Sequence, residues 1–297
     1  MIRYPFDDAQ VAQDIDAIDP RWAAKAAKRA AKIRRDGAYS EKSSIWSTVK
    51  PIFMLLQHNK CAYCERQFEN PDYGTIEFDV EHFRPKSAVP AWPDPVRHAG
   101  QRYAYKTGDL GAGYHWLAYE LSNYAASCKI CNSICKLNFF PVAGARAEQP
   151  AKGVSEADAR QALAEEQPYL CYPIGSADED PQDLITFRAT TAVPVGRTES
   201  QRRRGEIIIN FFALNEREQL HRERARMISL IGNAVGDLGQ PLTQHAVASY
   251  SSSSYPHAGC IRAFLSLWAA DPVTAQRIHQ ACSTYALTGD SAVPAAA

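Results

Sequence analysis

Two pairs of cysteines are the residues of this 297-residue chain whose spacing predicts chemistry most directly. Cys61 and Cys64 form one Cys-x-x-Cys pair, and Cys128 and Cys131 form the other. Four thiolates in tetrahedral geometry make a closed structural Zn²⁺ site with no open position for a reactant. We therefore expect structural zinc here and catalytic groups elsewhere. Cys135 lies close enough to replace a ligand, but we expect it to be a packed thiol.

Disulfides and a thioredoxin-like redox pair are the alternatives for the same cysteines. Disulfides need an oxidising compartment. The opening sequence MIRYPFDDAQ has neither the basic nor the apolar region of an export signal, so we expect a cytoplasmic protein with reduced thiols. No apolar run is long enough to cross a bilayer, and we expect no membrane partner.

A histidine preceded by a carboxylate lies between the two cysteine pairs. The alternation in TIEFDVEHF predicts a short half-buried strand that ends before Pro85. Glu81 and His82 are neighbours, so they serve one site only if the strand finishes or twists there. A neutral imidazole beside a cation-binding carboxylate can take a proton from water while the cation stabilises phosphate charge. A lone histidine at a strand end is more often structural, but the neighbouring motifs favour the catalytic interpretation.

The motifs taken together resemble those of a known family. CAYCE, EHFRPK, YHWLAYELSNYAASCKICN and then a lysine and FFP follow one another in the order seen in HNH endonucleases of the ββα-metal class. More narrowly, the chain resembles the HNH effector of Septu-type and retron-associated anti-phage defence systems. The resemblance is close from Cys61 to Pro141 and looser through FFALNEREQLHRERAR. It implies a metal-dependent endonuclease that hydrolyses DNA phosphodiester bonds and works beside an ATPase partner.

The resemblance implies roles for four residues around a catalytic cation. His82 matches the general base that activates water. Glu81 matches the acidic ligand of a catalytic Mg²⁺ or Mn²⁺, and Asp79 competes with it for that role. Asn132 matches the third motif position and would complete the cation site.

Further positions depend on the same resemblance. Asn123 matches the middle motif position, whose side chain holds a loop and orients the histidine. Lys136 is a candidate contact to the scissile or adjacent phosphate. The stretch between His82 and Asn123 is longer than a compact hairpin needs, so we expect an inserted loop. His115, in YHWLAY, is a further candidate, although its aromatic neighbours favour packing.

Contacts to nucleic acid must be local, because 33 lysines and arginines balance 33 acids. A helix expected to begin at Asp19 and Pro20 carries a basic stripe that no acid interrupts from Arg21 to Arg35. Such a stripe suits duplex phosphates or a partner protein, although it is more often a solvated face. The candidate contacts are Lys25, Lys28, Arg29 and Lys32 on this helix, and Arg84 and Lys86 after the histidine.

The surrounding elements predict an α+β, mainly helical protein. A zinc-pinned ββα-metal (HNH) module would carry N- and C-terminal helical additions, and zinc would replace the core that so short a module cannot build. Strands are expected at PYLCYP and DLITFRAT, with TAVPVG a turn or edge, and HAVASYSSSSYPHAG is expected to be a loop. The expected units are an N-terminal helical segment (1–58), the HNH module with the zinc site (59–145) and a mostly helical C-terminal region with a few short strands (146–297).

Two other functions stay open. The first is a non-catalytic zinc module that serves as a nucleic-acid or protein adaptor, for which neither His82 nor Asn132 is required. The second, a minor alternative, is cleavage of RNA such as a tRNA, since no motif distinguishes the sugar. DNA and an ATPase subunit are the expected partners, and assembly of several copies of the chain is left open.

Overall fold

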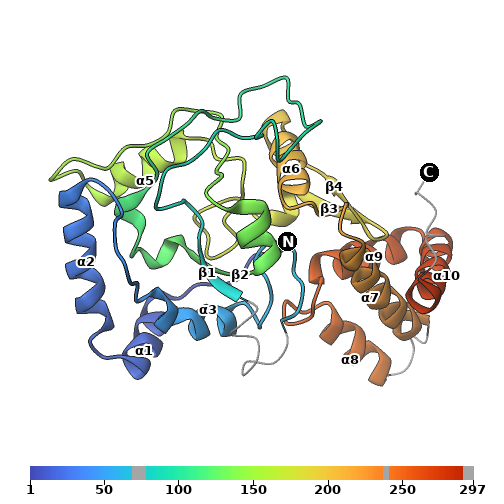
Figure 1. The fold of residues 1–297 in the computed structure, drawn as a ribbon. Helices are drawn as coiled ribbons and strands as arrows, with labels where there is room; N and C mark the ends of the chain where they lie inside the picture. Colours follow the sequence, from blue (N-terminus) through green and yellow to red (C-terminus); the bar gives the residue numbers. More distant parts are fainter. Residues whose placement is uncertain (69–77, 237–240, 290–297) are drawn as a thin grey trace.

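The structure is a computed structural model and describes residues 1–68, 78–236 and 241–289. Helices make up most of the regular structure, and the described part contains two small antiparallel sheets (Figure 1). The expected mainly helical α+β class is confirmed. Within the described ranges, no helix is long and apolar enough to cross a membrane.

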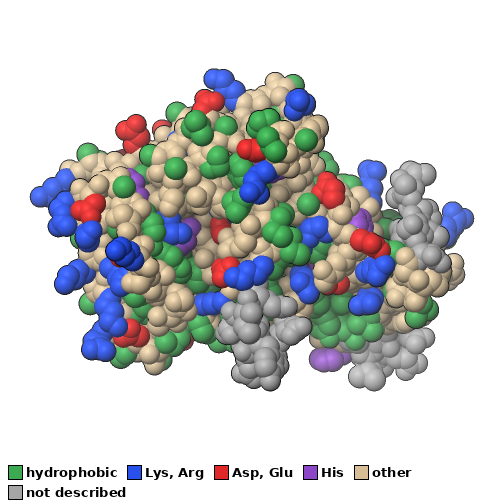
Figure 2. Space-filling view, in the orientation of Figure 1, with side chains coloured by type: hydrophobic (Ala, Val, Ile, Leu, Met, Phe, Trp, Pro, Cys, Tyr) green, Lys and Arg blue, Asp and Glu red, His purple; other side chains and the backbone are tan. Residues whose placement is uncertain are grey.

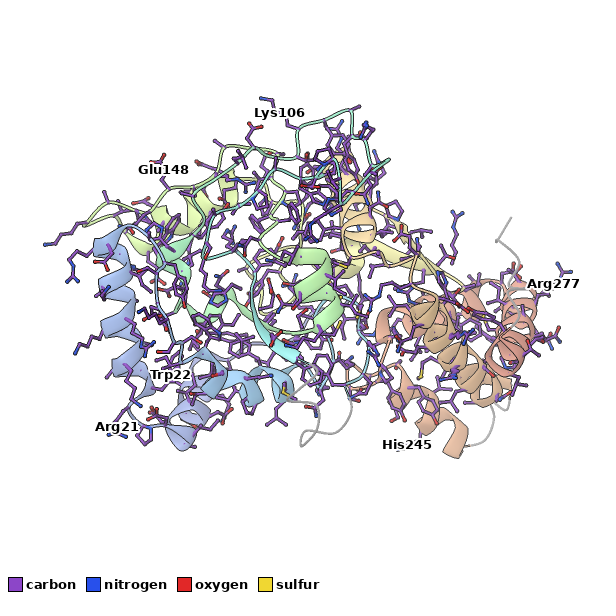
Figure 3. The ribbon with its side chains drawn as sticks, in the orientation of Figure 1. Arg21, Trp22, Lys106, Glu148, His245 and Arg277 are labelled. Carbon is purple, nitrogen blue, oxygen red and sulfur yellow. The ribbon has the colours of Figure 1, made fainter. Side chains whose placement is uncertain are left out.

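The N-terminal region is helical and carries the basic stripe. Its elements are α1 (Asp8–Ile18), α2 (Trp22–Asp36), the short 3-10 helix η1 (Trp46–Val49) and α3 (Lys50–Leu56). The expectation that Asp19 begins α2 is wrong: this residue ends α1, and its side chain accepts the N–H of Arg21 at 3.0 Å. Trp22 is buried and donates its ring N–H to Ile45 O at 2.8 Å, whereas Arg21 lies at the periphery (Figure 3).

A two-stranded sheet that leads into a short helix lies at the centre of the molecule (Figure 1). Strand β1 (Phe78–His82) pairs antiparallel with β2 (Tyr124–Cys128), and His82 is opposite Tyr124. The π-helix η4 (Ile130–Lys136) follows β2 almost at once. The order strand, strand, helix is the one expected for a ββα module. The part of the predicted strand before Phe78 lies outside the described residues.

The segment that joins β1 to β2 is mostly irregular, as expected for an inserted loop. It contains the short helices η2 (His115–Leu117) and η3 (Leu121–Asn123). An isolated antiparallel bridge between Val89 and Gly111 closes its middle part, and the side chain of Trp92 is buried.

The C-terminal region is mostly helical. Its elements are α5 (Glu156–Glu165), the 3-10 helix η5 (Pro181–Asp183), β3 (Ile185–Arg188), β4 (Thr191–Pro194), α6 (Glu199–Phe211), α7 (Glu218–Gly236), α8 (Pro241–Tyr250), α9 (Ala258–Ala270) and α10 (Pro272–Thr288). DLITF forms β3 as expected, and TAVPVG supplies its antiparallel partner β4. One expectation is wrong, because PYLCYP forms only an isolated bridge at Pro168. The Ser-rich stretch is a loop from Ser251 to His257 as expected, but its first residues belong to α8.

Two hydrophobic clusters form the core of the described residues. The first runs from the N-terminal helices through the β1–β2 sheet to α6, so Phe53 packs against Tyr124 with ring centroids 5.7 Å apart. The second is built by α7, α9 and α10. The first cluster contains residues on both sides of the predicted boundaries at 58 and 145. The division of the chain into three units therefore stays a prediction.

Candidate active site and zinc centre

The four cysteines meet in one buried cluster. The sulfurs of Cys61, Cys64, Cys128 and Cys131 all lie within 4.8 Å of one another. Cys64 Sγ and Cys128 Sγ are 3.9 Å apart, and a tetrahedral zinc site with Zn–S bonds of about 2.3 Å places sulfurs ~3.8 Å apart. All eight cysteines of the chain are described, and all eight are free thiols. The residues therefore fit a zinc ion.

The elements around the cluster explain why the sulfurs converge. Cys61 and Cys64 lie on a turn after α3, Cys128 ends β2, and Cys131 lies in the first turn of η4. The side chain of Gln57 joins this turn to β2, because it accepts the N–H of Ala126 at 2.7 Å and donates to the carbonyl of Ala126 at 2.8 Å.

Cys135 lies outside the four-sulfur cluster, as expected for a packed thiol. It is half-buried on η4, and burial raises the pKa of its thiol to about 11.

His82 is a buried, neutral histidine with one ring nitrogen bound. Its side chain is 5% exposed, and Nε2 lies 3.1 Å from the carbonyl oxygen of Ala118. A carbonyl only accepts hydrogen bonds, so Nε2 carries the proton and Nδ1 carries the lone pair. Burial lowers the pKa of His82 to about 3, and the charge of Lys86 adds to the effect. The imidazole is therefore an uncharged potential base.

Aromatic rings cover His82. The ring of Trp46, from η1, meets the imidazole edge-on at a centroid distance of 4.7 Å, and Tyr124 packs on it at 5.1 Å. Lys86 Nζ lies 4.8 Å from the centroid of Trp46 and 5.3 Å from that of Tyr39. No local pattern indicates this cover, because Trp46 and His82 belong to segments that only the fold brings together.

Asn123 joins the two segments that surround His82. Its Oδ1 accepts the backbone N–H of Arg84 at 2.7 Å, and its Nδ2 donates to Arg84 O at 3.0 Å and to Leu117 O at 3.3 Å. Leu117 precedes Ala118, whose carbonyl binds the imidazole. The geometry is compatible with the predicted role of Asn123 in holding a loop and orienting the histidine.

Glu81 is buried against a lysine. Lys136 Nζ lies 2.5 Å from Glu81 Oε1 and donates to the carbonyl of His82 at 3.0 Å, and its side chain is fully buried. Burial raises the pKa of Glu81, and Lys136 acts against that rise. Lys136 thus contacts the predicted cation ligand in this structure.

Asp79 lies two residues before Glu81, on the same face of β1. Lys129 Nζ is 2.6 Å from Asp79 Oδ2, and Asn132 Nδ2 donates to the same oxygen at 3.1 Å. Two carboxylates and an amide are the oxygen ligands that a hard divalent cation prefers. Each carboxylate nevertheless has a lysine partner, which no local pattern indicated.

Of the predicted cation ligands, Asp79 and Asn132 are joined by a hydrogen bond, and Glu81 lies on the same face of β1 as Asp79. In the described part of the chain, no hydrogen bond or ion pair joins the imidazole to Glu81, Asp79 or Asn132. The link runs through Lys136, which contacts the Glu81 carboxylate and the His82 carbonyl. Glu81 and His82 are neighbours on β1, and neighbouring strand residues face opposite sides of a sheet. The absence of a direct bond between these two side chains agrees with that alternation.

The predicted nucleic-acid contacts are mostly paired with acids. Basic side chains follow the edge of the molecule formed by α2 (Figure 2). The partners there are Asp19 for Lys25 (2.6 Å), Glu41 for Arg29 (3.2 Å) and Asp36 for Lys32 (2.5 Å), while Lys28 is exposed. Arg84 pairs with buried Glu166 at 2.9 Å. Exposed pairs contribute about 1 kcal/mol or less, so the α2 side chains can exchange partners.

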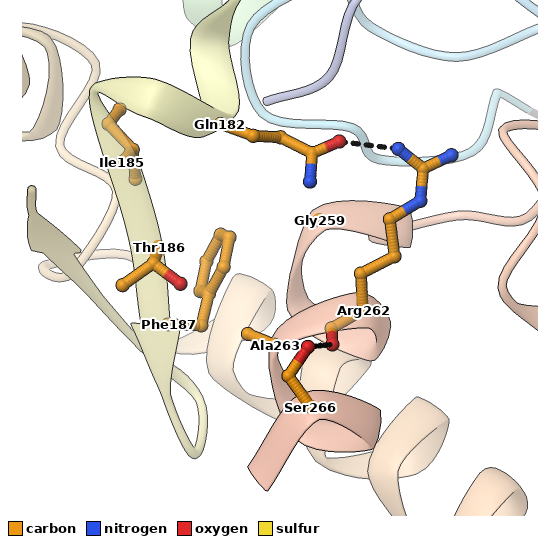
Figure 4. Close-up of a pocket in the computed structure, with 8 residues that line it drawn as sticks. All are labelled: Gln182, Ile185, Thr186, Phe187, Gly259, Arg262, Ala263 and Ser266. Carbon is orange, nitrogen blue, oxygen red and sulfur yellow. Dashed lines mark hydrogen bonds between the residues drawn. The ribbon is translucent and has the colours of Figure 1, made fainter. Parts of the chain in front are cut away.

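Two other places carry less chemistry. The Nε2 of His115 lies 2.8 Å from Gln149 Oε1, and its ring packs edge-on against Trp116, in line with the packing role. A cavity of about 190 Å³ lies between β3 and α9 (Figure 4). Its polar groups bind one another, since Arg262 donates to Gln182 and its carbonyl accepts from Ser266.

Fold and site together define a mainly helical α+β protein with a buried four-cysteine cluster able to hold zinc at the junction of a small sheet and a helix. Among curated proteins, the chain is 28% identical over 190 residues to the Septu protein PtuB of Bacillus mycoides (strain KBAB4). The matched stretch is 64% of this chain and 52% of that protein, so the chain spans about half the length of the curated relative. No family model matches, and neither does any solved structure.

Proposed function

We propose that the chain is an HNH-class endonuclease that hydrolyses DNA phosphodiester bonds as the effector of an anti-phage defence system. The observation that carries this proposal is the state of His82: it is neutral, its Nε2–H is held by a backbone carbonyl, and its Nδ1 keeps a lone pair. The similarity to a Septu protein supports the defence role.

His82 would act as the general base. Nδ1 takes a proton from the attacking water, and the hydrogen bond from Nε2–H to Ala118 O stabilises the imidazolium that forms. Asn123 keeps that carbonyl in place through its bonds to Leu117 and Arg84. With a pKa of about 3 the buried imidazole is a weak base, so catalysis requires Trp46 to move and admit water.

Glu81 and Asn132 would hold the catalytic Mg²⁺ or Mn²⁺, with Asp79 as the competing carboxylate. The position of Glu81 on the same face of β1 as Asp79 supports a ligand role. Once bound, such a cation stabilises negative charge on the phosphate and on the leaving 3′ oxygen. Lys136 must then leave Glu81, which frees its ammonium group for the phosphate.

An ATPase partner fits the charge distribution. The chain has no net charge, and acids neutralise much of the basic edge on α2. Such a surface has little affinity of its own for DNA. We propose that a partner delivers the nuclease to DNA, so tight DNA binding by the isolated chain would count against this part of the proposal.

A second candidate function is a non-catalytic zinc adaptor. The observations that favour it are the cover of Trp46 over His82 and the ion pair between Glu81 and Lys136. In that case the four cysteines bind zinc only to stabilise the fold, and His82 and Glu81 have a packing role without catalysis.

The test is cleavage of supercoiled and linear plasmid by wild type and His82→Ala, with Mg²⁺, Mn²⁺ or EDTA, alone and with any ATPase encoded beside the gene. His279→Ala is a matched control, since His279 Nε2 also lies 3.1 Å from a backbone carbonyl, that of Ser229. We expect metal-dependent nicking that only His82→Ala abolishes, at unchanged zinc content. No cleavage by zinc-loaded wild type under any condition favours the adaptor, and cleavage of RNA alone favours the tRNA alternative.

A further inference from the structure

Hydrogen bonds reach the four sulfurs from backbone N–H groups and from an arginine, and the hydroxyl of Ser127 lies 3.8 Å from Cys61 Sγ. The backbone N–H of Cys128 lies 3.4 Å from Cys61 Sγ, and that of Cys131 lies 3.5 Å from Cys128 Sγ. Arg217, far along the chain, approaches the other two sulfurs: NH1 is 3.3 Å from Cys131 Sγ and NH2 is 4.0 Å from Cys64 Sγ. The guanidinium therefore contacts one sulfur of each Cys-x-x-Cys pair.

The charge of the cluster explains why a cation suits this position. Zinc with four thiolates retains roughly two negative charges, and buried charge is costly without a partner. Arg217 is half-buried, and in the described part of the chain it forms no ion pair with a carboxylate. Its planar fork of N–H donors can serve two acceptors at once, so the sulfurs are its evident partners.

Packing holds Arg217 against the cluster. The turn between α6 and α7 carries Phe212, whose ring stacks on Tyr63 at a centroid distance of 4.3 Å and an angle of 15°. Tyr63 lies between Cys61 and Cys64 in the sequence. The carbonyl of Arg217 accepts the N–H of Leu220 at 2.9 Å, in the first turn of α7.

Other contacts attach the C-terminal helices to the same cysteine turn. Lys60 Nζ donates to Tyr255 O at 2.7 Å, and Glu65 Oε2 accepts the N–H of Gly259, in the first turn of α9, at 3.1 Å. The turn that carries the first cysteine pair therefore also forms the surface against which α7 and α9 pack.

We propose that Arg217 is a positioning residue of the zinc site. Its guanidinium balances the charge of the Cys64 and Cys131 thiolates and fixes their orientation, so that zinc retention depends on the docking of α7. This role rests on the four-cysteine site and is independent of nuclease activity.

The test compares full-length, zinc-loaded Arg217→Gln and Arg217→Lys with wild type. Arg222→Gln is the matched control, because Arg222 is exposed on α7 and pairs with Glu218 at 2.5 Å. Zinc affinity and release rate are measured by competition with a chromophoric chelator. Loss of a residue that supports metal ligands typically weakens metal binding by about 10- to 100-fold. We expect that loss for Arg217→Gln, an intermediate value for Arg217→Lys and none for Arg222→Gln.

The absorption spectrum of the cobalt-substituted protein distinguishes this role from a purely structural one, which would leave the spectrum unchanged. Thiolate-to-cobalt charge-transfer bands report on the sulfurs directly, and loss of N–H donors should shift them to lower energy in Arg217→Gln and less so in Arg217→Lys. A folded Arg217→Gln protein with wild-type zinc affinity and wild-type bands overturns the proposal. If that variant does not fold, Arg217→Lys decides: zinc release at the wild-type rate overturns it as well.

Discussion

Replacing Trp46 by alanine should expose His82 and raise the proton affinity of its imidazole. In the wild type the indole meets the imidazole edge-on at 4.7 Å, and the imidazole is 5% exposed. The indole is itself only partly buried. Removal of the indole should therefore expose His82 to solvent and should not leave a closed cavity.

The expected size of the effect follows from the pKa of His82. Burial lowers this pKa to about 3, whereas an unperturbed histidine has a pKa of about 6.5, and each unit corresponds to ~1.4 kcal/mol. Protonating the native imidazole therefore costs roughly 5 kcal/mol more than protonating a free one. The ring of Tyr124 and the charges of Lys86 and Lys136, which also lower the pKa, remain in the variant. We therefore expect about half of the shift to be relieved and a pKa of ~5.

The sign of the pH dependence follows from the same shift. The folded-state pKa of His82 is lower than the unfolded value, so the unfolded chain binds the proton more tightly. The contribution to stability is complete above about pH 6.5 and is lost as the pH falls towards 3. Trp46→Ala should raise the folded-state pKa and so narrow the pH range between the folded and unfolded pKa values of His82. The variant should therefore lose less stability in acid through this residue.

The assay is an NMR titration of the histidine side chains in the full chain without added divalent cation, with His82→Ala for assignment. Trp268→Ala is the control, because Trp268 is half-buried on α9 and packs on Phe264 in the other cluster. A folded Trp46→Ala protein whose His82 pKa stays within about 0.5 of the wild-type value would falsify the reasoning. An equal shift in the control would do so too.

Two further predictions concern the supports of the site. Cys128→Ser should lose zinc and unfold the module. Cys282→Ser is the control and should keep its zinc, because Cys282 is buried on α10 outside the sulfur cluster. Metal analysis and thermal denaturation check this prediction, and a well-folded, zinc-free Cys128→Ser protein contradicts it. Asn123→Ala should lower the free energy of unfolding by about 2–4 kcal/mol, because three hydrogen bonds are lost and partly buried backbone groups of Arg84 and Leu117 lose a partner. Urea denaturation measures the loss, and a value below about 1 kcal/mol contradicts the prediction.

Local patterns predicted the elements well where one physical preference dominated. The stripe after Pro20 forms α2, and DLITF forms β3. The errors concern the ends of elements, which local propensity places least precisely. Asp19, a good cap by type, ends α1, and the Ser-rich stretch begins as helix α8.

The candidate site shows the same division between local and tertiary information. The spacing of each Cys-x-x-Cys pair places its two sulfurs on one turn, and strand alternation places Asp79 and Glu81 on one face. Neither pattern contains the lysines that neutralise these carboxylates, because Lys129 and Lys136 lie about fifty residues away. The acids that pair with α2 lie nearer in the chain: Asp36 is four residues after Lys32, a spacing at which helix residues are neighbours, and Glu41 reaches Arg29 only through the fold after the helix.

The sequence by itself determined which residues could bind metal and which could exchange a proton, because residue type and short-range spacing decide those chemistries. Only the tertiary structure decided which of them are covered or paired. Trp46 lies over His82, Lys136 lies against Glu81, and Arg217 lies on the sulfurs. Each of these contacts joins segments far apart in the chain, and they form because the packing of the core, rather than any local preference, brings those segments together.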